Sequence, residues 1–440
     1  MSCSPAIRRL AQRRRFAPAW PCALLLLGGL AAAARANGLV FTVNTAADLP
    51  DASLGDHIAD ADLSTPGAQV TLRAAVMQAN AEFGPDTIMI PAGIWKLTLA
   101  GTDDAKLGDL DVTDDLTIIG VAADPQTGEA GTIIDAKKLK DRVFDVVSGR
   151  TLTLQGLTLR NGRALGTGQS GGAIRVAGSA SLTQVILSGC KSGLGGGAID
   201  VTSNLSSLTL QDVLFEKDTA TGDGGGLSIE GGLLDAERVT WQSCKSTKGH
   251  GGGLALTAGF GMLKNVTFSS NSAKLDGGAI EVLSLQNLQG GDGTPGVLSI
   301  TSSTLGDNVC KATSGIGSDD SFATNNVLLR DTLLDNKGKR NWGPGAPPSS
   351  LGGNLDSGST CALPDDELSN TDPLLLKLKN YGGFTPTRAL KTGSPAIDHG
   401  VDSGAPTTDQ RGMPRVDIPD LGGLSSYDCG AFEFEEPAQP

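Results

Sequence analysis

The residues in this sequence with the clearest capacity for chemistry are six aspartates in its first third. They are Asp103, Asp104, Asp109, Asp111, Asp114 and Asp115. Carboxylates gathered so closely can bind Ca²⁺, which prefers oxygen ligands. The same side chains also form polar turns by accepting hydrogen bonds from nearby backbone amides. We favour the turn, so we expect no cofactor or metal and keep Ca²⁺ as the one cation to consider.

Other candidates for catalysis are isolated. Gly249-His250-Gly251 resembles a polygalacturonase signature, and Asn370-Thr-Asp372 resembles a carboxylate motif. We expect a corner histidine in the first and a turn in the second. His57 and His399 lie far from His250 in the sequence, so no histidine-based triad or metal-ligand set is visible. We therefore assign no catalytic, cofactor-binding or metal-binding residue.

Between Leu157 and Asn336 the sequence repeats a bulky apolar residue followed, three positions later, by a turn residue. The bulky column is Leu159, Leu187, Phe215, Trp241, Phe268, Leu305 and Leu333. The turn column is Gly162, Cys190, Asp218, Cys244, Asn271, Asn308 and Asn336. Both advance by 28, 28, 26, 27, 37 and 28 residues, and an insertion at 288–296 accounts for the long step. Repeats of this length are single supersecondary units of a solenoid.

The repeating unit consists of strands. Runs such as 152–159 and 208–215 alternate apolar and polar residues, whereas a helical solenoid would need longer stretches of helical periodicity. We therefore predict an all-β, single-stranded parallel β-helix. Its bulky column forms an interior ladder, with coils stacked about 4.8 Å apart. A β-sandwich is the alternative, but sandwiches do not hold a fixed period.

Two lysines lie beside the turn column. Lys191 follows Cys190, and Lys245 follows Cys244 two coils later. Aligned ammonium groups could bind an anionic sugar. We expect them instead to be solvated surface residues.

Residues 1–36 have the features of a signal peptide. Five arginines precede the apolar run 23–34, which ends in the small-residue step Ala34-Arg35-Ala36. A membrane anchor is the alternative, but the run is short for a span, and we expect no transmembrane segment in the mature chain. Removing the segment takes away six arginines and no acid, leaving 29 basic and 48 acidic residues and a net charge of −19. This charge argues against nucleic acid as a partner.

Several longer motifs carry a family resemblance. Segments 70–80 (VTLRAAVMQAN), 86–93 (DTIMIPAG) and 108–120 (GDLDVTDDLTIIG) together resemble the CSLREA domain of secreted bacterial β-helix proteins. Val70 stands where that domain has Cys, and Ala74 where it has Glu. The Gly-Gly-Ala-Ile steps resemble repeats of polymorphic outer-membrane proteins. Segments 381–390 (YGGFTPTRAL), 393–398 (GSPAID), 408–412 (TDQRG) and 429–433 (CGAFE) resemble the choice-of-anchor Q domain. The resemblance implies a right-handed, exported, surface-displayed β-helix.

The expected domain organisation follows from these motifs. It comprises a signal peptide (1–36), a CSLREA-like cap with the first coils (37–120), β-helix repeats (121–337), a Pro/Gly-rich connection (338–350), a choice-of-anchor Q-like domain (351–434) and a tail (435–440). A helix over 71–80, with Thr71 as its N-cap, is expected to cover the N-terminal end. The C-terminal domain is expected to be an irregular β cap.

Five cysteines follow the signal segment. Cys190 and Cys244 should be two coils apart, about 9.6 Å, which exceeds the reach of a disulfide. Cys310 has no well-placed partner. We therefore predict a disulfide between Cys361 and Cys429 and treat the other three as buried thiols.

The C-terminal motifs also contain charges of both signs: Arg388, Asp398, Asp409, Arg411 and Glu433. Burying such charges is costly unless they are paired. Our hypothesis is that they form ion pairs that dock the C-terminal domain on the last coil.

We predict a non-catalytic scaffold, secreted or at the bacterial cell surface and monomeric, that binds extracellular glycans or surface proteins. The alternative is a polysaccharide lyase or glycoside hydrolase acting on acidic polysaccharide in a groove. Such an enzyme needs paired carboxylates, or an Asp-bound cation with an Arg or Lys. Converging groups of this kind would favour the enzyme, flat Ser/Thr-lined ladders would favour binding, and a face without any pocket would favour a spacer.

Overall fold

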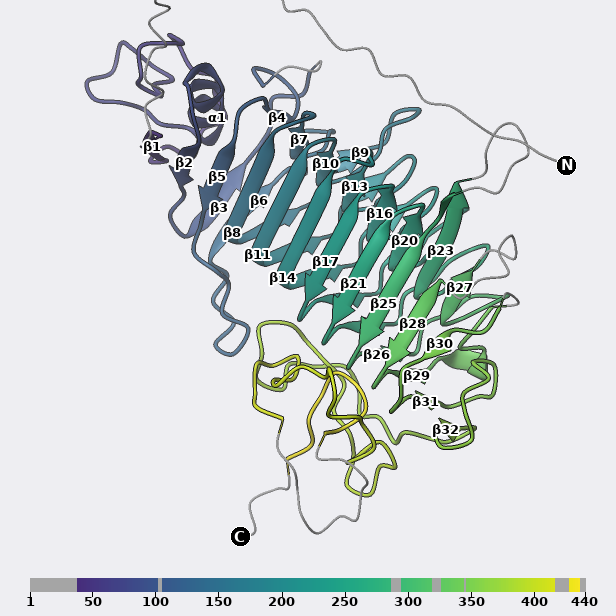
Figure 1. Cartoon of the computed structure of the whole chain (residues 1–440). Helices are drawn as coiled ribbons and strands as arrows, with labels where there is room; N and C mark the ends of the chain where they lie inside the picture. Colours follow the sequence, from purple (N-terminus) through teal and green to yellow (C-terminus); the bar gives the residue numbers. More distant parts are fainter. Residues whose placement is uncertain are drawn as a thin grey trace, which may run out of the picture.

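The computed structural model describes residues 38–101, 105–285, 294–318, 326–343, 346–415 and 427–435. The predicted signal peptide (1–36) and the pair Asp103 and Asp104 lie outside the described residues. Within them, the chain winds into an elongated stack of coils joined by long parallel ladders (Figure 1). The chain is therefore an all-β parallel β-helix. In this part of the chain, no helix has the length and apolar character needed to cross a membrane.

One 19-stranded parallel sheet forms two of the three walls of the coil. Wall 1 contains β1 (Val40–Thr42), β2 (Asp86–Met89), β5 (Leu116–Ile119), β17 (Leu233–Glu237), β21 (Phe260–Lys264), β25 (Val297–Thr301), β28 (Val327–Arg330) and β30 (Ser349–Ser350). Wall 2 contains β3 (Gly93–Lys96), β6 (Thr132–Asp135), β18 (Thr240–Gln242), β22 (Thr267–Ser269), β26 (Thr304–Gly306), β29 (Leu333–Asp335), β31 (Leu355–Asp356) and β32 (Leu368–Ser369). Three long strands, β8 (Thr151–Arg160), β11 (Ser179–Ser188) and β14 (Ser207–Glu216), run through both walls.

The chain bends at columns of residues with positive φ. Between walls 1 and 2 these are Gly156, Gln184, Asp212, Arg238, Asn265, Ser302 and Asp331. At the far edge of wall 2 they are Asn161, Gly189, Lys217, Ser243, Ser270 and Asp307. This conformation is unfavourable for residues other than glycine. Its recurrence at the same place in each coil shows that the corners are set by the stacking as a whole.

A separate sheet forms wall 3. It contains β4 (Leu110–Val112), β7 (Phe144–Val146), β10 (Ile174–Val176), β13 (Ile199–Val201), β16 (Leu227–Glu230), β20 (Leu254–Thr257), β23 (Ile280–Leu285) and β27 (Ile316–Ser318), with β24 (Thr294–Pro295) antiparallel to β23. Between walls 2 and 3 runs a short ladder of β9 (Arg163–Ala164), β12 (Lys191–Ser192), β15 (Thr219–Ala220) and β19 (Lys245–Ser246). The corner before wall 3 needs glycine. At Gly196, for example, φ is +59° and a Cβ would lie 2.0 Å from the carbonyl oxygen of Ile199.

The interior of wall 2 is a continuous apolar ladder. Strand register places Leu159, Leu187, Phe215, Trp241, Phe268 and Leu305 over one another in successive coils. The Trp241 ring stacks on Phe215 with centroids 5.1 Å apart and on Phe268 with centroids 4.4 Å apart. All six side chains are buried. The residues that recur with the sequence period therefore form one continuous apolar core.

The last predicted member of this ladder, Leu333, lies elsewhere. Register pairs Leu305 with Leu334, and Leu333 pairs with Thr304. The turn column keeps its alignment. Asn336 stacks on Asn308, 28 residues earlier, and its side-chain oxygen accepts the Asn308 backbone N–H at 3.1 Å. The strand is therefore displaced by one residue relative to the corner. Leu333 faces outward and is buried in a second apolar cluster under the C-terminal segment.

The turn column forms a buried ladder of asparagines in the last coils. In the series Asn271, Asn308, Asn336 and Asn341, each side-chain oxygen from Asn308 onward accepts the backbone N–H of the preceding member, which lies one coil earlier except for the last pair. Each side-chain amide also donates onward; that of Asn308 reaches the Asn336 oxygen at 2.7 Å. A single 3-10 turn, η1 (Lys337–Lys339), lies between the last two members. These bonds satisfy corner amides that the strands leave unpaired.

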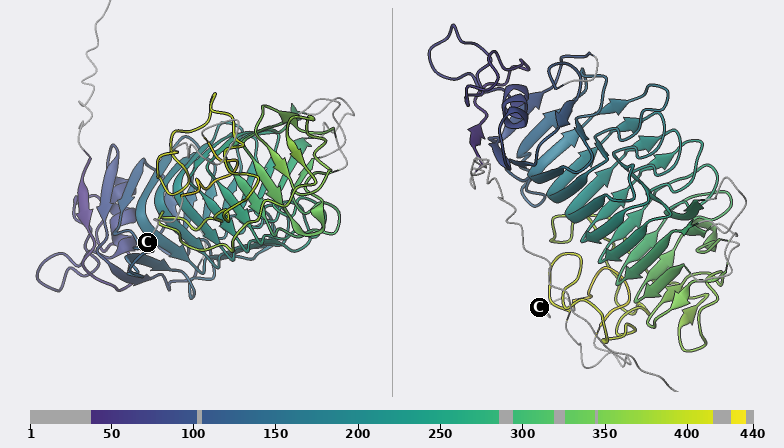
Figure 2. Two further views of the ribbon diagram at one scale, coloured as in Figure 1. Left: turned by 90° about the horizontal axis from the view of Figure 1, so that it is seen from below. Right: turned by 45° about the horizontal axis from the view of Figure 1, so that its top comes forward.

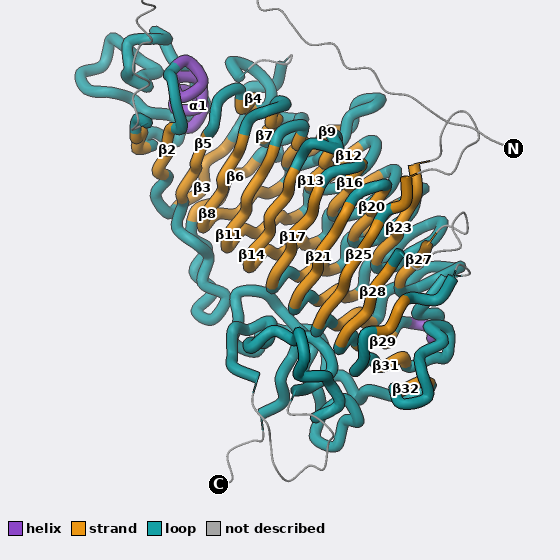
Figure 3. The backbone as a smooth tube through the Cα atoms, in the orientation of Figure 1, coloured by secondary structure: helices purple, strands orange, loops and turns teal. Residues whose placement is uncertain are grey.

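Helix α1 (Leu72–Ala81) lies at the N-terminal end of the stack (Figures 1 and 3). The Thr71 hydroxyl accepts the backbone N–H of Ala74 at 3.0 Å, which is an N-cap bond. Residues 72–79 are all buried, and several join the main core. Even Arg73 is enclosed, where it forms an ion pair with Asp48 at 2.7 Å. The helix therefore covers apolar surface of the first coil.

The C-terminal segment lies along the side of the stack rather than over its end. Residues up to 369 still form the wall strands β30, β31 and β32, so the coils continue beyond the predicted boundary at 350. The chain then folds back along the outer face of wall 2 (Figures 1 and 2). Its hydrogen bonds reach four successive coils at Arg238, Thr240, Asn265, Thr267, Thr304 and Asp331.

A buried glutamine is the centre of this contact. Gln410 donates to the Thr240 hydroxyl at 2.7 Å and accepts from the Thr267 hydroxyl at 2.6 Å. One coil further, the Thr304 hydroxyl accepts the backbone N–H of Ala431 at 3.0 Å. Because these threonines are aligned by strand register, the outer face of wall 2 offers a regular strip of hydroxyls that the segment binds.

The ion pairs of the segment differ from the predicted set. Arg388 does reach the coil, at 2.8 Å from Asp307. Arg411 instead pairs with Asp409 inside the segment at 2.7 Å, and Asp398 donates its backbone N–H to Asp428. Glu433 pairs at 2.9 Å with Arg415, a residue outside the predicted group. Arg415 also donates to Asn265 at 3.0 Å and so links the segment to the corner between walls 1 and 2.

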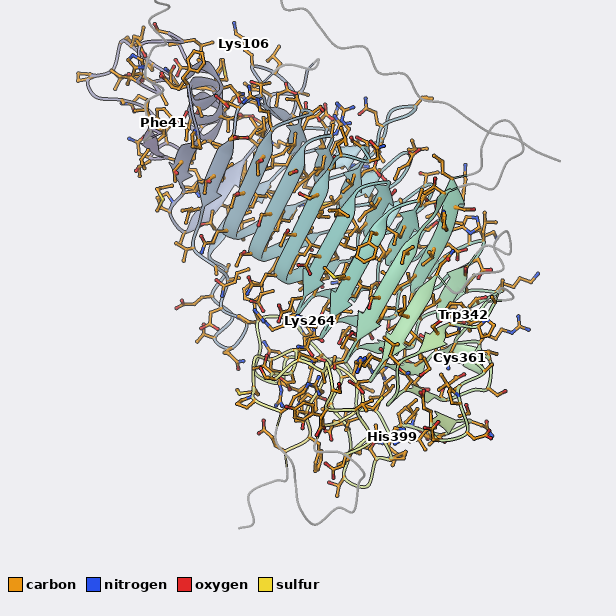
Figure 4. The ribbon with its side chains drawn as sticks, viewed as in Figure 1. Phe41, Lys106, Lys264, Trp342, Cys361 and His399 are labelled. Atoms are coloured by element: carbon orange, nitrogen blue, oxygen red, sulfur yellow. The ribbon has the colours of Figure 1, made fainter. Side chains whose placement is uncertain are left out.

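The five cysteines of the described residues are buried free thiols, so the structure lacks the predicted Cys361–Cys429 disulfide. Cys361 packs in the main core near the last coils (Figure 4), where Asp356 accepts its backbone N–H at 2.9 Å. Cys429 belongs to the second apolar cluster, which the C-terminal segment forms with the last coils. Burial raises the pKa of both thiols well above the usual value. The two thiols are therefore held in separate clusters.

Trp241 tests the interior ladder. Replacing Trp241 with Ala should lower the free energy of unfolding by about 3–5 kcal/mol, because it leaves a cavity between two rings. Trp241→Phe should cost far less, because the buried indole N–H has no hydrogen-bond partner among the described residues. Urea unfolding followed by circular dichroism measures both. Equal losses in the two variants would contradict the stacked arrangement.

Arg415 tests the lateral docking. Arg415→Ala leaves Glu433 buried without its partner and breaks the bond to Asn265, so limited proteolysis should cleave the C-terminal segment much faster. The coils should keep their circular dichroism spectrum. Lys391→Ala, at an exposed position of the same segment, is the control. A segment as resistant as that of the wild type would show that Arg415 does not hold it.

Candidate functional site on the outer walls

The outer face of wall 1 carries a regular array of uncharged hydrogen-bonding side chains, here called the hydroxyl grid. It consists of Thr151, Thr153, Gln155, Ser179, Ser181, Thr183, Ser207, Thr209 and Gln211 on β8, β11 and β14. Strand register aligns them in three columns, each with one residue per coil. All nine are exposed or half-buried, while the leucines and alanine between them are buried. The grid is therefore a flat polar surface on a rigid sheet.

An apolar platform continues the grid on the next two coils. It is formed by Leu233 and Phe260, in register with Ser207, and by Met262. These side chains are 56%, 43% and 46% exposed, respectively. Large apolar groups clustered at an exposed site indicate a binding surface more often than isolated ones do. The wall thus presents hydroxyls and amides beside an aromatic ring.

Wall 3 carries a charged pocket of about 600 Å³ where α1 lies beside its first strands. It is lined by Leu54, Met77, Asn80, Ala105, Lys106, Asp111, Thr113, Asp145, Val147 and Arg175. Asp111, Asp145 and Arg175 are direct neighbours in β4, β7 and β10. Lys106 projects at the same end of the molecule (Figure 4). Carboxylates and cations therefore meet in one cavity.

A buried ion-pair network supports this pocket. The Arg142 guanidinium lies 3.0 Å from Asp109 and 3.4 Å from Asp145, and Arg175 donates to Asp145 at 2.9 Å. Burial, together with the charge of nearby Asp141, raises the pKa of Asp109 to about 7 despite the opposing effect of Arg142. Asp109 is therefore a weaker acid than an ordinary aspartate.

The same aspartates have the spacing of a cation site. Asp109, Asp111 and Asp145 each offer a carboxylate oxygen, and these atoms lie within 4.8 Å of one another. However, Arg142 and Arg175 already supply positive charge to Asp109 and Asp145. Two guanidinium groups at this distance would repel Ca²⁺. The carboxylate spacing favours Ca²⁺ and the arginine charges oppose it, so Ca²⁺ binding by this cluster stays a prediction.

A second pocket of about 350 Å³ follows on wall 3. Its lining includes Asp200, Asp223, Ser228 and Glu230, and Asp200 is the register neighbour of Arg175. Burial raises the pKa of Asp200. At the adjoining corner, His250 donates its backbone N–H to Asp223 at 2.7 Å, and its Nδ1 lies 3.8 Å from the buried Glu281. Wall 3 therefore carries a row of charged groups.

The remaining candidates from the sequence are scattered. His57 pairs with Glu82 at 2.7 Å on the surface, and His399 lies in the C-terminal segment, where burial lowers its pKa. Lys191 and Lys245 are exposed, with Thr219 between them. Asp372 accepts the backbone N–H of Leu374 at 2.9 Å, as in a turn. The structure brings none of these residues into the pockets of wall 3.

Arg142, Asp145 and Arg175 were not singled out from the sequence. The last two occupy the central position of apolar–charged–apolar triplets that recur along wall 3: Leu110-Asp-Val112, Phe144-Asp-Val146, Ile174-Arg-Val176, Ile199-Asp-Val201 and Ile280-Glu-Val282. Alternation places the central residue on the outer face of a strand. A search of the sequence for charged residues at the centre of these triplets would have found the row of charged groups on wall 3.

Comparisons with known proteins add little to this picture. No protein-family model matches the chain, and no curated protein matches it. Among solved structures, the A-module of mannuronan C-5 epimerase AlgE6 from Azotobacter vinelandii is similar at 14% identity, over 69% of this chain and 97% of that module, with a TM-score of 0.25. The class of protein therefore rests on the strand ladders themselves, and the three family resemblances of the sequence stay predictions.

Asp109 makes stability depend on pH. Its pKa is about 7 in the folded chain, against an ordinary value of 3.8 for an aspartate carboxyl in the unfolded chain. Its carboxyl therefore stabilises the fold most below about pH 4, and this contribution is lost as the pH rises through about 7. The free energy of unfolding of the wild type, minus that of Asp109→Asn, should fall across this range. Urea titrations at several pH values measure it; a constant or rising difference would contradict the assignment.

Proposed function

We propose that this protein is an exported, non-catalytic scaffold that binds an extended glycan along the outer face of wall 1. The observation that carries the proposal is the hydroxyl grid with its adjoining apolar platform. A flat Ser/Thr-lined ladder is the feature that distinguishes a binding face from a catalytic groove.

The chemistry of the grid suits a sugar chain. Serine and threonine hydroxyls and glutamine amides can both donate and accept hydrogen bonds, as sugar hydroxyls do. Phe260 adds an apolar surface that can pack against the C–H face of a sugar ring. The side chains are spaced by the coil repeat, about 4.8 Å, so they are already placed for a ligand that repeats along one direction.

Location and assembly are part of the same proposal. The apolar run at 23–34 and the step Ala34-Arg35-Ala36 support export through a cleaved signal peptide. The resemblance to CSLREA, polymorphic outer-membrane and choice-of-anchor Q proteins supports a right-handed β-helix displayed by a bacterial cell. We propose that it acts as a monomer. Its acidic charge disfavours nucleic acid as a ligand.

The binding face can be tested with two substitutions. Thr209→Arg places a bulky charge on the grid, and Phe260→Ala removes the aromatic part of the platform. Each should weaken retardation of the protein in gels that contain neutral polysaccharides, and its sedimentation with insoluble ones, by tenfold or more. Thr127→Arg, at an exposed turn position outside the grid and the platform, is the matched control. Failure of the wild type to bind any polysaccharide in a broad glycan panel would overturn the proposal.

A second candidate function is catalysis on acidic polysaccharide. The observation that favours it is the convergence of Asp111 and Asp145 with Lys106 and Arg175 in the charged pocket. The cations would bind a uronate carboxylate, and Asp111, which lines the same pocket, would be the candidate for proton transfer. Release of unsaturated uronates or reducing ends, lost in Asp111→Asn and Arg175→Ala, would establish this function and replace the scaffold.

A further inference from the structure

A small pocket at the start of wall 2 combines three lysines in an otherwise acidic protein. The pocket has a volume of about 180 Å³ and is lined by Lys96, Leu97, Thr98, Asp135, Lys137 and Lys138. Lys96 ends β3, Asp135 ends β6, and the other two lysines follow in the next turn. The full chain has a net charge of −13, so this concentration of positive charge is a local exception.

The one acid of the pocket is already neutralised. Asp135 accepts hydrogen bonds from Arg160 at 2.9 and 3.0 Å, from the Asn161 side chain at 2.9 Å and from the Lys137 backbone N–H at 3.0 Å. Burial alone would raise the pKa of Asp135, but these hydrogen bonds outweigh it and lower the pKa below the usual value. Asp135 and Arg160 therefore form a closed pair that adds almost no net charge.

The three ammonium groups remain available. Within the described residues, none of Lys96, Lys137 and Lys138 has a carboxylate within ion-pair distance. All three side chains are exposed. All three line the same pocket, so an anion bound in it would be attracted by all three. The electrostatic field of the pocket therefore selects a negatively charged group.

The floor of the pocket is rigid and partly apolar. Leu97 is buried in the main core, and the backbone N–H groups of Thr98 and Leu99 both donate to Asp48, which in turn pairs with Arg73 of α1. The volume corresponds to about six water molecules. It can hold a carboxylate or sulfate group with part of the sugar ring that carries it.

We propose that this pocket binds the anionic group of an acidic glycan, either a uronate carboxylate or a sulfate ester, between Lys96, Lys137 and Lys138. The site lies on wall 2, uses charge instead of hydroxyls, and takes a ligand class that the uncharged grid of wall 1 does not select. It therefore stands whether or not the grid binds neutral glycans. Both sources of the anion share one chemistry, an oxyanion carried by a sugar.

The experiment is a calorimetric titration of the full chain with three probes: an oligogalacturonate, its methyl-esterified form and a sulfated oligosaccharide. The wild type should bind at least one of the charged probes and should bind the esterified one at least tenfold more weakly. The affinity should fall with added salt, as expected for exposed charges. Which charged probe binds more tightly identifies the source of the anion.

The variants separate this site from ordinary surface charge. The triple change Lys96→Gln, Lys137→Gln and Lys138→Gln should reduce affinity for the charged probe at least tenfold, and the corresponding Arg variants should retain it. The matched control is Lys191→Gln with Lys245→Gln, which removes aligned surface lysines that line neither this pocket nor the two pockets of wall 3. Failure of the wild type to bind either charged probe, equal binding of the esterified probe, or an unaffected Gln variant would each overturn the proposal.

Discussion

The register between successive coils is the constraint on which the rest of the structure depends. Each coil places Leu159, Phe215 or Trp241 directly on its neighbour, and the rings can stack at 4.4 and 5.1 Å only if the strands do not slip. A shift by one residue would turn every side chain to the opposite face. The corners with positive φ maintain this register by ending each wall at the same repeat position. Everything on the outside is therefore also arranged in columns.

Much of the fold could be predicted from the sequence because the signals are local and repeated. Strand alternation and a constant period predicted a parallel β-helix, and the ladders show one. The errors occur where distant segments decide. Leu333 looks like a core residue by spacing, but it faces outward and is buried by the C-terminal segment. The predicted Cys361–Cys429 disulfide failed for the same reason. The sequence does not show that the two cysteines are buried in separate apolar clusters.

The candidate sites were less predictable for a related reason. Asp109 and Asp111 stood out because they are close in sequence, whereas the neighbouring Arg142, Asp145 and Arg175 come from later coils. The hydroxyl grid was present in runs such as Thr151-Leu-Thr-Leu-Gln155, but the same alternation is needed by any half-buried strand. Only the register shows that three such runs form one plane. Function on a solenoid is therefore encoded between coils more than within them.

The lateral position of the C-terminal segment has a mechanical consequence. If the chain ended in its last coil, a force applied to its C-terminus would act on that coil alone. The coils would then unfold one after another. Here the segment is bonded to four successive coils through Thr240, Asn265, Thr267, Thr304 and Asp331. Tension would be shared among these coils as shear across their hydrogen bonds. This arrangement would protect the last coils from unravelling under tension.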